Sequence, residues 1–351
     1  MDVTLLPADD PPGVRRRRIL VGILRESVGF ALLTVLAPFA LLAAATVDLA
    51  LWLRRRKPWM AVRLVALVWW FLLGELRGLL AVLGVWIVSG GPWARDTPAR
   101  RRRVYRLQVQ WATGHLAGVQ RLCGLRFEVA GDDLVGRGPM IVLYRHASIV
   151  DNALPAALIS RRHGIDLRYV LKDGMQLLPT LDIGARWVPT CFVHRGSADP
   201  AREIARVRVL ARDLTGERDG VLIYPEGTRF TPAKLAKLRE SGDIGDPALR
   251  ERIGRLRHLL PPRLGGPLGL LEEAPHAAVV VCGHVGLDGL HDLRSLWSGR
   301  LVGTTVRVRF WRHERSELPA DRAGQAEWLY DRWQELDDWV AAQRDLEPAA
   351  A

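Results

Sequence analysis

The chain has 351 residues, with 50 Lys and Arg against 38 Asp and Glu, so its formal net charge is +12 and its pI is about 10.5. Hydrophobic residues make up 49% of the chain, which excludes a disordered protein and allows one large domain plus an appendage. The positive charge indicates anionic partners: a phospholipid surface, phosphorylated small molecules or nucleic acid. Cys123, Cys191 and Cys282 lie far apart without CxxC spacing, which argues against a disulfide framework or a zinc site.

The N-terminal region predicts a membrane anchor. Four arginines at 15–18 precede an uncharged apolar run from Ser27 to Val47, which is about the 20 residues that a helix needs to cross a bilayer core. A signal peptide is the alternative, but the run is long and no clear small-x-small cleavage site follows it. A second apolar stretch, Val62 to Val88, is interrupted by Glu75 and Arg77, and it either spans the membrane or lies in the interface.

Basic clusters flank both apolar stretches, at 15–18, 54–57 and 95–103. Two full crossings would place the 54–57 loop opposite the other clusters, against the positive-inside rule. A hairpin that dips into one leaflet lets every cluster meet anionic headgroups on one side. Two ordinary spans with a tolerated basic loop stay open as the alternative. In both cases residues 1–95 are predicted to form a basic segment and membrane-anchoring helices.

Residues 96–351 are predicted to form a single α/β domain, with a mixed central sheet flanked by helices, because short apolar runs alternate there with longer mixed segments. Helices are expected at 152–162 and 200–214. The charged segment 230–262 is interpreted as a surface insertion, and 321–343 as a C-terminal amphipathic helix. The expected strands are Arg126–Val129, Met140–Tyr144, Leu167–Leu171, Thr190–Val193, Val221–Tyr224, Ala277–Val281 and Thr304–Trp311.

The first candidate site follows the strand at 140–144, where His146 lies just past the strand end and Asp151 lies five residues later. Ligands of open α/β sheets bind at such strand ends. Residues five apart on one helix point about 140° away from each other, so a contact between these two side chains requires a turn. With that turn, Asp151 binds one ring nitrogen and leaves the other free as a base. An isolated HxxxxD pattern has low specificity.

Polar residues also follow three further strands. Lys172 and Arg195 each close a strand and together suit a phosphate, and Glu226-Gly227-Thr228-Arg229 closes another. A carboxylate, a flexible backbone and a guanidinium at one strand end suit a hydroxylated, phosphorylated ligand. Taken singly, these are surface residues or turns. Their succession at four strand ends predicts one substrate site.

In this arrangement the sequence resembles the glycerolipid acyltransferases, a family that includes 1-acylglycerol-3-phosphate acyltransferase. The resemblance extends from Ile141 to Val281 with the family blocks in order. The blocks are HxxxxD at His146 and Asp151, a second block at Lys172, Pro179, Gly184 and Arg195, the Phe-Pro-Glu-Gly-Thr-Arg block at 224–229, and a degenerate Val-Pro-Ile-Val-Pro block at 275–281. The insertion after residue 229 is similar to that of the lysocardiolipin and lysophospholipid acyltransferase subgroup. Arg145 departs from the asparagine frequent before the histidine.

The resemblance implies transfer of a fatty acyl group from acyl-CoA or acyl-carrier protein to a lysophospholipid hydroxyl, with 1-acyl-sn-glycerol 3-phosphate as the expected acceptor. His146 and Asp151 would be catalytic, while Lys172, Arg195, Glu226, Gly227, Thr228 and Arg229 would bind substrate. No cofactor or metal ion is expected. The partners are a phospholipid membrane, the acceptor and the donor, and the site is expected to face the cytoplasm at the cell inner membrane, since the donors are cytosolic.

Other functions stay open at this point. Another lysophospholipid or glycerol 3-phosphate is an alternative acceptor. A non-catalytic, membrane-tethered protein that binds anionic lipid would explain the charge and the anchor, but it would not explain polar residues at successive strand ends. Nucleic acid is not expected as a partner, because the sequence has no recognisable nucleic-acid-binding motif.

Overall fold

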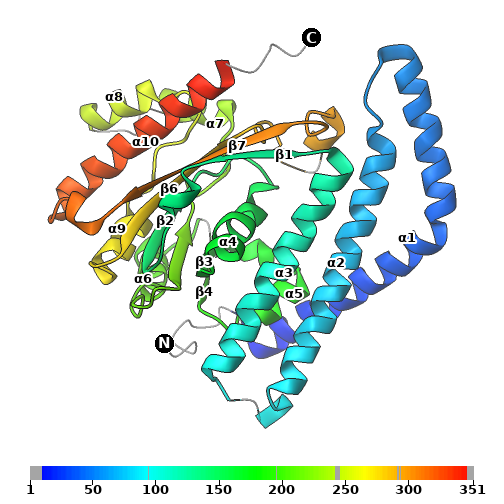
Figure 1. Cartoon of the computed structure of the whole chain (residues 1–351), viewed down its shortest axis with the longest axis horizontal. Helices are drawn as coiled ribbons and strands as arrows, with labels where there is room; N and C mark the ends of the chain where they lie inside the picture. Colours follow the sequence, from blue (N-terminus) through cyan, green and yellow to red (C-terminus); the bar gives the residue numbers. More distant parts are fainter. Residues whose placement is uncertain are drawn as a thin grey trace. The chain divides into compact units, whose positions relative to one another are not determined.

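The computed structural model describes residues 10–93, 95–194, 196–241, 246–290, 292 and 294–345. Its seven strands form a mixed sheet in the order β1-β7-β6-β2-β5-β3-β4 (Figure 1). The mixed sheet with flanking helices and the two long apolar N-terminal helices confirm the predicted fold class. The strands are β1 (Arg126–Ala130), β2 (Met140–Tyr144), β3 (Asp166–Lys172), β4 (Thr190–Val193), β5 (Asp219–Ile223), β6 (Ala278–Val285) and β7 (Thr305–His313).

The chain forms two compact units that are interleaved in the sequence. One contains Met1–Arg126, Ala153–Ala198 and Leu296–Thr304, and the other contains Phe127–Asn152, Asp199–Ser295 and Thr305–Ala351. The domain boundary predicted at residue 95 stays a prediction.

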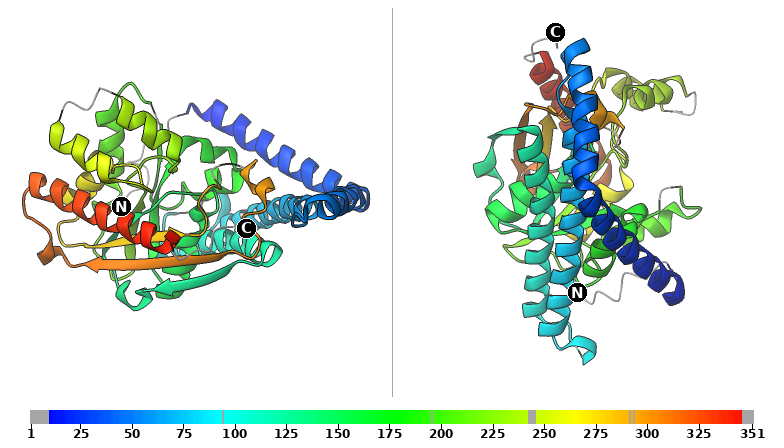
Figure 2. Two further views of the ribbon diagram at one scale, coloured as in Figure 1. Left: turned by 90° about the horizontal axis from the view of Figure 1, so that it is seen from above. Right: turned by 90° about the vertical axis from the view of Figure 1, so that its right-hand side faces the viewer.

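Three long helices, α1 (Pro12–Arg55), α2 (Met60–Val88) and α3 (Pro98–Cys123), dominate the first unit. Figures 1 and 2 show α1 and α2 side by side as an antiparallel pair, and α1 bends part-way along its length. Pro38 lies inside α1 and accounts for the bend, since proline removes a backbone donor and clashes with the preceding turn.

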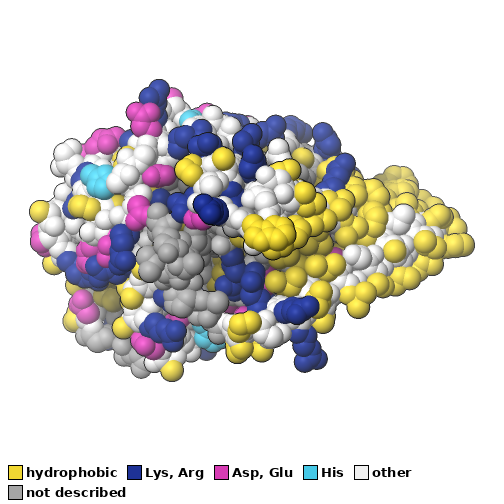
Figure 3. All heavy atoms as spheres, turned by 90° about the horizontal axis from the view of Figure 1, so that it is seen from below, with side chains coloured by type: hydrophobic (Ala, Val, Ile, Leu, Met, Phe, Trp, Pro, Cys, Tyr) yellow, Lys and Arg dark blue, Asp and Glu magenta, His cyan; other side chains and the backbone are white. Residues whose placement is uncertain are grey.

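Both α1 and α2 are long and apolar enough to cross a membrane, by length and composition. Only 6% and 17% of their most apolar windows are buried, unlike a helix in the core of a soluble protein. Exposed apolar side chains include Leu32, Val35 and Phe39 of α1 and Leu80 of α2. Figure 3 shows hydrophobic side chains gathered over the end of the molecule that these helices form.

The basic start of α1 is partly neutralised inside the first unit. Asp182 of α5 (Pro179–Gly184) is fully buried and accepts hydrogen bonds from Arg15 and Arg18, at 3.5 Å and 2.8 Å. Arg18 also donates to Gln176. Two of the four arginines at 15–18 are therefore held by protein carboxylate.

The segment predicted as one helix at 152–162 is helical but irregular. A 3-10 turn, η4 (Asp151–Ala153), precedes a π-helical turn, η5 (Ala156–Ser160), and one α turn, α4 (Arg161–His163). Pro155 directly precedes the π turn, where its missing backbone donor is tolerated. The other short turns are η2 (Gly91–Trp93), η3 (Asp132–Leu134), η6 (Asp173–Leu177), η7 (Ser295–Ser298) and η8 (Arg315–Glu317).

In the second unit β2 lies between β5 and β6 and is parallel to both, while β7 is antiparallel to β6. Every residue of β2 and β6 is buried, and strands covered on both faces read as continuous apolar runs. The helices of this unit are α6 (Pro200–Val209), α7 (Pro232–Glu240), α8 (Pro247–Arg255), α9 (Gly265–Glu273) and α10 (Arg322–Asp345).

Helix α10 packs along β6. It buries Leu329, Trp333, Leu336 and Val340, the residues whose four-three-four spacing indicated a core-facing helix. Helices α7 and α8 occupy the segment that was interpreted as a surface insertion.

We expect Gly283→Ala to destabilise the second unit by about 1–3 kcal/mol, because overpacking has that cost. A Cβ at Gly283 of β6 would lie 2.2 Å from Leu336 Cδ1, and Leu336 is only 1% exposed, so it has no free space to move into. Unfolding in denaturant measures the loss. Gly254→Ala in α8 is the control: nothing lies within 4 Å of its added Cβ, and it should be neutral or stabilising.

Candidate active site

The catalytic pair predicted from the sequence is formed where β2 leaves the sheet. His146 Nδ1 lies 3.1 Å from Asp151 Oδ1, and both side chains are buried, with 8% and 0% of their surface exposed. The backbone N–H groups of Ala147 and Ser148 donate to Asp151 Oδ2, each at 2.7 Å. Asp151 therefore closes the turn that brings it back to the histidine.

The hydrogen bonds fix which ring nitrogen of His146 is free to accept a proton. A carboxylate only accepts, so Nδ1 carries the proton that faces Asp151, and Nε2 keeps its lone pair. Within the described residues, no group hydrogen bonds to Nε2. Burial alone would raise the pKa of Asp151, but the imidazoles of His146 and His284 outweigh it and hold that pKa well below its ordinary value.

Glu226 supports the backbone of His146. Its Oε1 accepts the N–H of His146 at 2.8 Å, and its Oε2 accepts the N–H of Leu260 at 2.9 Å. The Leu260 segment is in turn held by α10, since Trp333 donates to the Leu260 carbonyl and Asp337 accepts the N–H groups of residues 257 and 258. The glutamate thus ties the ends of β2 and β5 to the C-terminal helix.

Burial raises the pKa of Glu226 to about 8, although two backbone donors and Arg145 oppose the shift. The folded protein then binds a proton at pH values where the unfolded chain, with a pKa of 4.5, has lost it. Stability from this group is complete below the unfolded pKa and is lost as the pH rises through the folded pKa.

We therefore expect the free energy of unfolding of the wild type to fall as the pH rises from 5 to 8, relative to Glu226→Gln. The amide does not titrate, so the variant should be less stable overall but have a flatter pH dependence. Denaturant unfolding at both pH values tests this, and parallel pH profiles for the two proteins would contradict it.

The rest of the Glu-Gly-Thr-Arg run forms a tight turn after β5. Gly227 has φ +66° and donates its N–H to the Tyr224 carbonyl. A Cβ at Gly227 would come within 2.9 Å of Arg263 Cδ. Lys234 donates to Thr228 Oγ1 and to the Arg229 carbonyl, at 2.9 Å and 2.7 Å. The Arg229 side chain is half-buried.

The contacts described above do not include the other two residues predicted to bind substrate, Lys172 and Arg195. Lys172 is exposed at the end of β3, in the first compact unit. Arg195 lies outside the described residues. The substrate-binding roles of Lys172, Arg195 and residues 226–229 stay predictions.

Residues 126–246 match the acyltransferase family model, and this range contains every predicted site residue. The chain is 25% identical over 254 residues to mouse (Mus musculus) 1-acyl-sn-glycerol-3-phosphate acyltransferase epsilon, with 67% of this chain aligned. The chain thus contains an acyltransferase segment and is similar to a glycerolipid acyltransferase. Its alignment spans 64% of the length of the mouse relative.

Among solved structures, the chain is similar to the 1-acyl-sn-glycerophosphate (LPA) acyltransferase PlsC from Thermotoga maritima. The TM-score is 0.46 at 13% sequence identity, with 79% of this chain and 100% of that chain covered.

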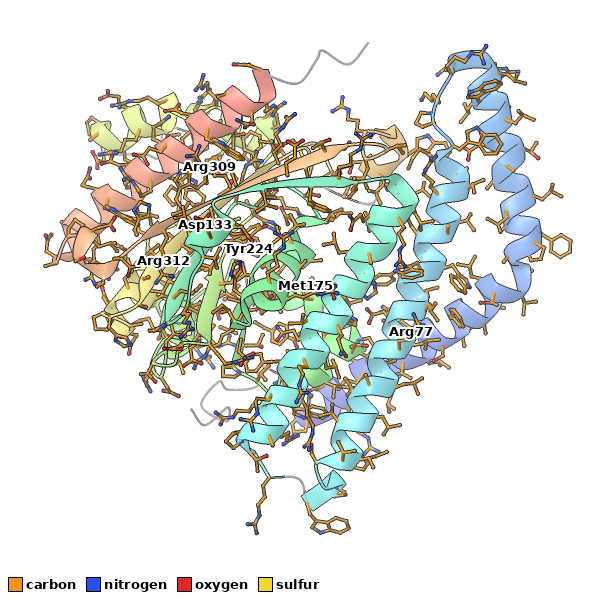
Figure 4. The ribbon with its side chains drawn as sticks, viewed as in Figure 1. Arg77, Asp133, Met175, Tyr224, Arg309 and Arg312 are labelled. Atoms are coloured by element: carbon orange, nitrogen blue, oxygen red, sulfur yellow. The ribbon has the colours of Figure 1, made fainter. Side chains whose placement is uncertain are left out.

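Two contacts in the site are not evident from the sequence. Arg145, which departs from the family pattern, is fully buried and forms an ion pair with Asp288 at 2.6 Å. Tyr224, which follows β5 (labelled in Figure 4), packs its ring on His146 with centroids 4.4 Å apart. No local pattern reveals either partner, because Asp288 lies far along the chain and an aromatic residue at position 224 also fits a core role.

Proposed function

We propose that this chain is an O-acyltransferase that moves a fatty acyl group from acyl-CoA or acyl-carrier protein to the free hydroxyl of a lysophospholipid, 1-acyl-sn-glycerol 3-phosphate being the first candidate. The observation that carries the proposal is the buried His146–Asp151 pair, with Nδ1 bound to the carboxylate and Nε2 available. The match of residues 126–246 to the acyltransferase family model and the similarity to a mouse acyltransferase support the reaction class.

In the proposed reaction, His146 Nε2 takes the proton of the acceptor hydroxyl while the oxygen attacks the thioester carbonyl carbon. Asp151 holds the ring and stabilises the imidazolium that forms. The tetrahedral intermediate then breaks its C–S bond, and the leaving thiolate takes the proton from the imidazolium. An ester and a free thiol result, and His146 returns to its starting tautomer. No covalent enzyme intermediate is required.

Acceptor binding is proposed to use the phosphate-binding groups Lys172, Arg195 and Arg229. Both oxygens of Glu226 are already bound by backbone N–H groups, so we propose that it contributes by fixing the position of His146. Gly227 and Thr228 shape the turn that carries Arg229.

We further propose that α1 and α2 embed the protein in the cell inner membrane with its site on the cytoplasmic side. Their exposed apolar surface supports this, and a membrane concentrates both the lysolipid and the acyl donor. Whether the pair spans the bilayer or lies in one leaflet is decided by labelling single cysteines placed in the 54–57 loop with a membrane-impermeant reagent.

The activity is tested by incubating the purified full chain in vesicles with radiolabelled acyl-CoA, or with acyl-carrier protein, and a panel of acceptors. The panel contains 1-acyl-sn-glycerol 3-phosphate, other lysophospholipids and glycerol 3-phosphate. We expect label in phosphatidic acid with the first acceptor and none with His146→Ala. Preference for another acceptor would correct the substrate. No acylated lipid with any acceptor would overturn the proposal.

A further inference from the structure

A second histidine contacts Asp151 from the opposite side. His284 lies on β6 and is fully buried. Its Nε2 lies 3.4 Å from Asp151 Oδ2 and 3.2 Å from the carbonyl oxygen of Arg145. His146 lies 3.1 Å from the other carboxylate oxygen, Oδ1. The carboxylate therefore contacts two imidazole rings, one from the loop after β2 and one from the neighbouring strand β6.

The surroundings of His284 determine where its proton lies. The carboxylate of Asp151 and the carbonyl of Arg145 are both acceptors, so Nε2 must be the nitrogen that carries hydrogen. The guanidinium of Arg145 donates to the carbonyl oxygen of His284 itself.

The other groups near His284 leave its second ring nitrogen, Nδ1, without a partner among the described residues. Asp288 neutralises Arg145, and the Tyr144 ring lies 5.8 Å from the imidazole, centroid to centroid. His284 thus supplies one N–H donor to the Asp151 carboxylate.

The hydrogen bonds to Asp151 show what this donor contributes. A carboxylate has about four acceptor sites. Oδ2 faces Ala147, Ser148 and His284, and Oδ1 faces His146. Ala147 and Ser148 belong to the same loop as Asp151 and move with it. His284 belongs to a fully buried strand, so it is the donor that ties the carboxylate to the sheet.

We propose that His284 is a positioning residue of the acyl-transfer site, which holds the Asp151 carboxylate in place and takes part of its negative charge. The inference rests on the proposed function, because it assigns His284 a task in that reaction. His284 does not reach the substrate itself, since it is fully buried behind Asp151. It acts through Asp151 on the orientation and basicity of His146.

The test compares His284→Phe with His284→Gln. Phenylalanine keeps an aromatic ring but loses the donor, whereas the glutamine amide places an N–H close to the position of the imidazole Nε2. For His284→Phe we expect kcat to fall roughly ten-fold with KM nearly unchanged, as for loss of one hydrogen bond to a charged group. Without this donor, more negative charge on the Asp151 carboxylate acts on His146 and stabilises its protonated form. The acidic limb of the kcat/KM profile should therefore move to higher pH. His284→Gln should restore both.

A structural role alone would not move the pH limb. His276→Gln is the control, because His276 is an exposed histidine of the same unit whose Nε2 lies 2.7 Å from the Leu214 carbonyl oxygen. Circular dichroism and thermal unfolding show whether each variant is folded. If His284→Phe does not fold, His284→Met removes the same donor. A fall in kcat with an unmoved acidic limb, or no recovery in His284→Gln, would overturn the proposal.

A second readout needs no substrate, so it separates failure of this inference from failure of the proposed function. In protein labelled with ¹⁵N-histidine, the ring shifts of His146 are assigned by their loss in His146→Gln. We expect these shifts to differ between the wild type and His284→Phe and to return in His284→Gln. Identical His146 shifts in all three proteins would refute the coupling, whatever the enzyme acylates.

Discussion

Replacing Asp151 with asparagine is expected to lower kcat/KM by roughly 10²–10⁴-fold, the usual range for loss of general-base catalysis. The reason is a forced change of tautomer. Three N–H donors face Oδ2: those of Ala147, Ser148 and His284. The amide of asparagine must place its oxygen there, so its NH₂ group faces His146.

That NH₂ group needs an acceptor, and Nδ1 of His146 is the one that the described residues place opposite it. The ring then carries its proton on Nε2. This nitrogen therefore has no lone pair with which to take the proton of the acceptor hydroxyl. The side-chain volume barely changes, so stability should change far less than activity. Radiolabelled acyl transfer measured beside thermal unfolding separates the two effects.

His146→Gln should show a similar loss, and the double variant with Asp151→Asn should be hardly worse than either single variant, because the pair works as one unit. KM for the acceptor should stay nearly constant in all three proteins. Losses that multiply in the double variant would show that Asp151 acts independently of His146, against the mechanism proposed above.

The sheet was predictable because its strands carry their own signal. Buried strands such as β2 and β6 are short apolar runs bounded by polar turns, and their parallel register places the segments after residues 144 and 223 at one edge. The contact between His146 and Asp151 could also be anticipated, because five residues and one turn connect them.

Other features depend on partners distant in sequence. In the sequence His284 is indistinguishable from the other residues of an apolar strand. Only the register of β6 against β2 shows that it lies beside the loop after Tyr144. The irregular helix at 151–163 arises where Asp151 closes a turn and Pro155 follows, and helical periodicity cannot reveal such a break. The substrate-binding role of Glu226 stays a prediction, and the two backbone N–H groups that its oxygens accept could not be identified without the fold.

Arg145→Met is expected to destabilise the second unit by about 3–5 kcal/mol, the cost of removing one partner of a buried ion pair. The Arg145 side chain is fully buried, and it donates to Asp288 and to the carbonyl oxygens of His258 and His284. Methionine fills the space but leaves the carboxylate and both carbonyls without this donor. Lysine is expected to fail as well, because an ammonium group cannot reproduce the planar fork of donors.

A double-mutant cycle distinguishes loss of the ion pair from loss of packing. Arg145→Met with Asp288→Leu removes both charges, so it should recover part of the stability that Arg145→Met loses, as measured by denaturant unfolding. If the stability loss of the double variant equals the sum of the two single losses, Asp288 and Arg145 are not coupled. If the cycle gives the expected coupling, the arginine that departs from the family pattern acts in the scaffold beneath His146, and acceptor choice must be sought at exposed positions.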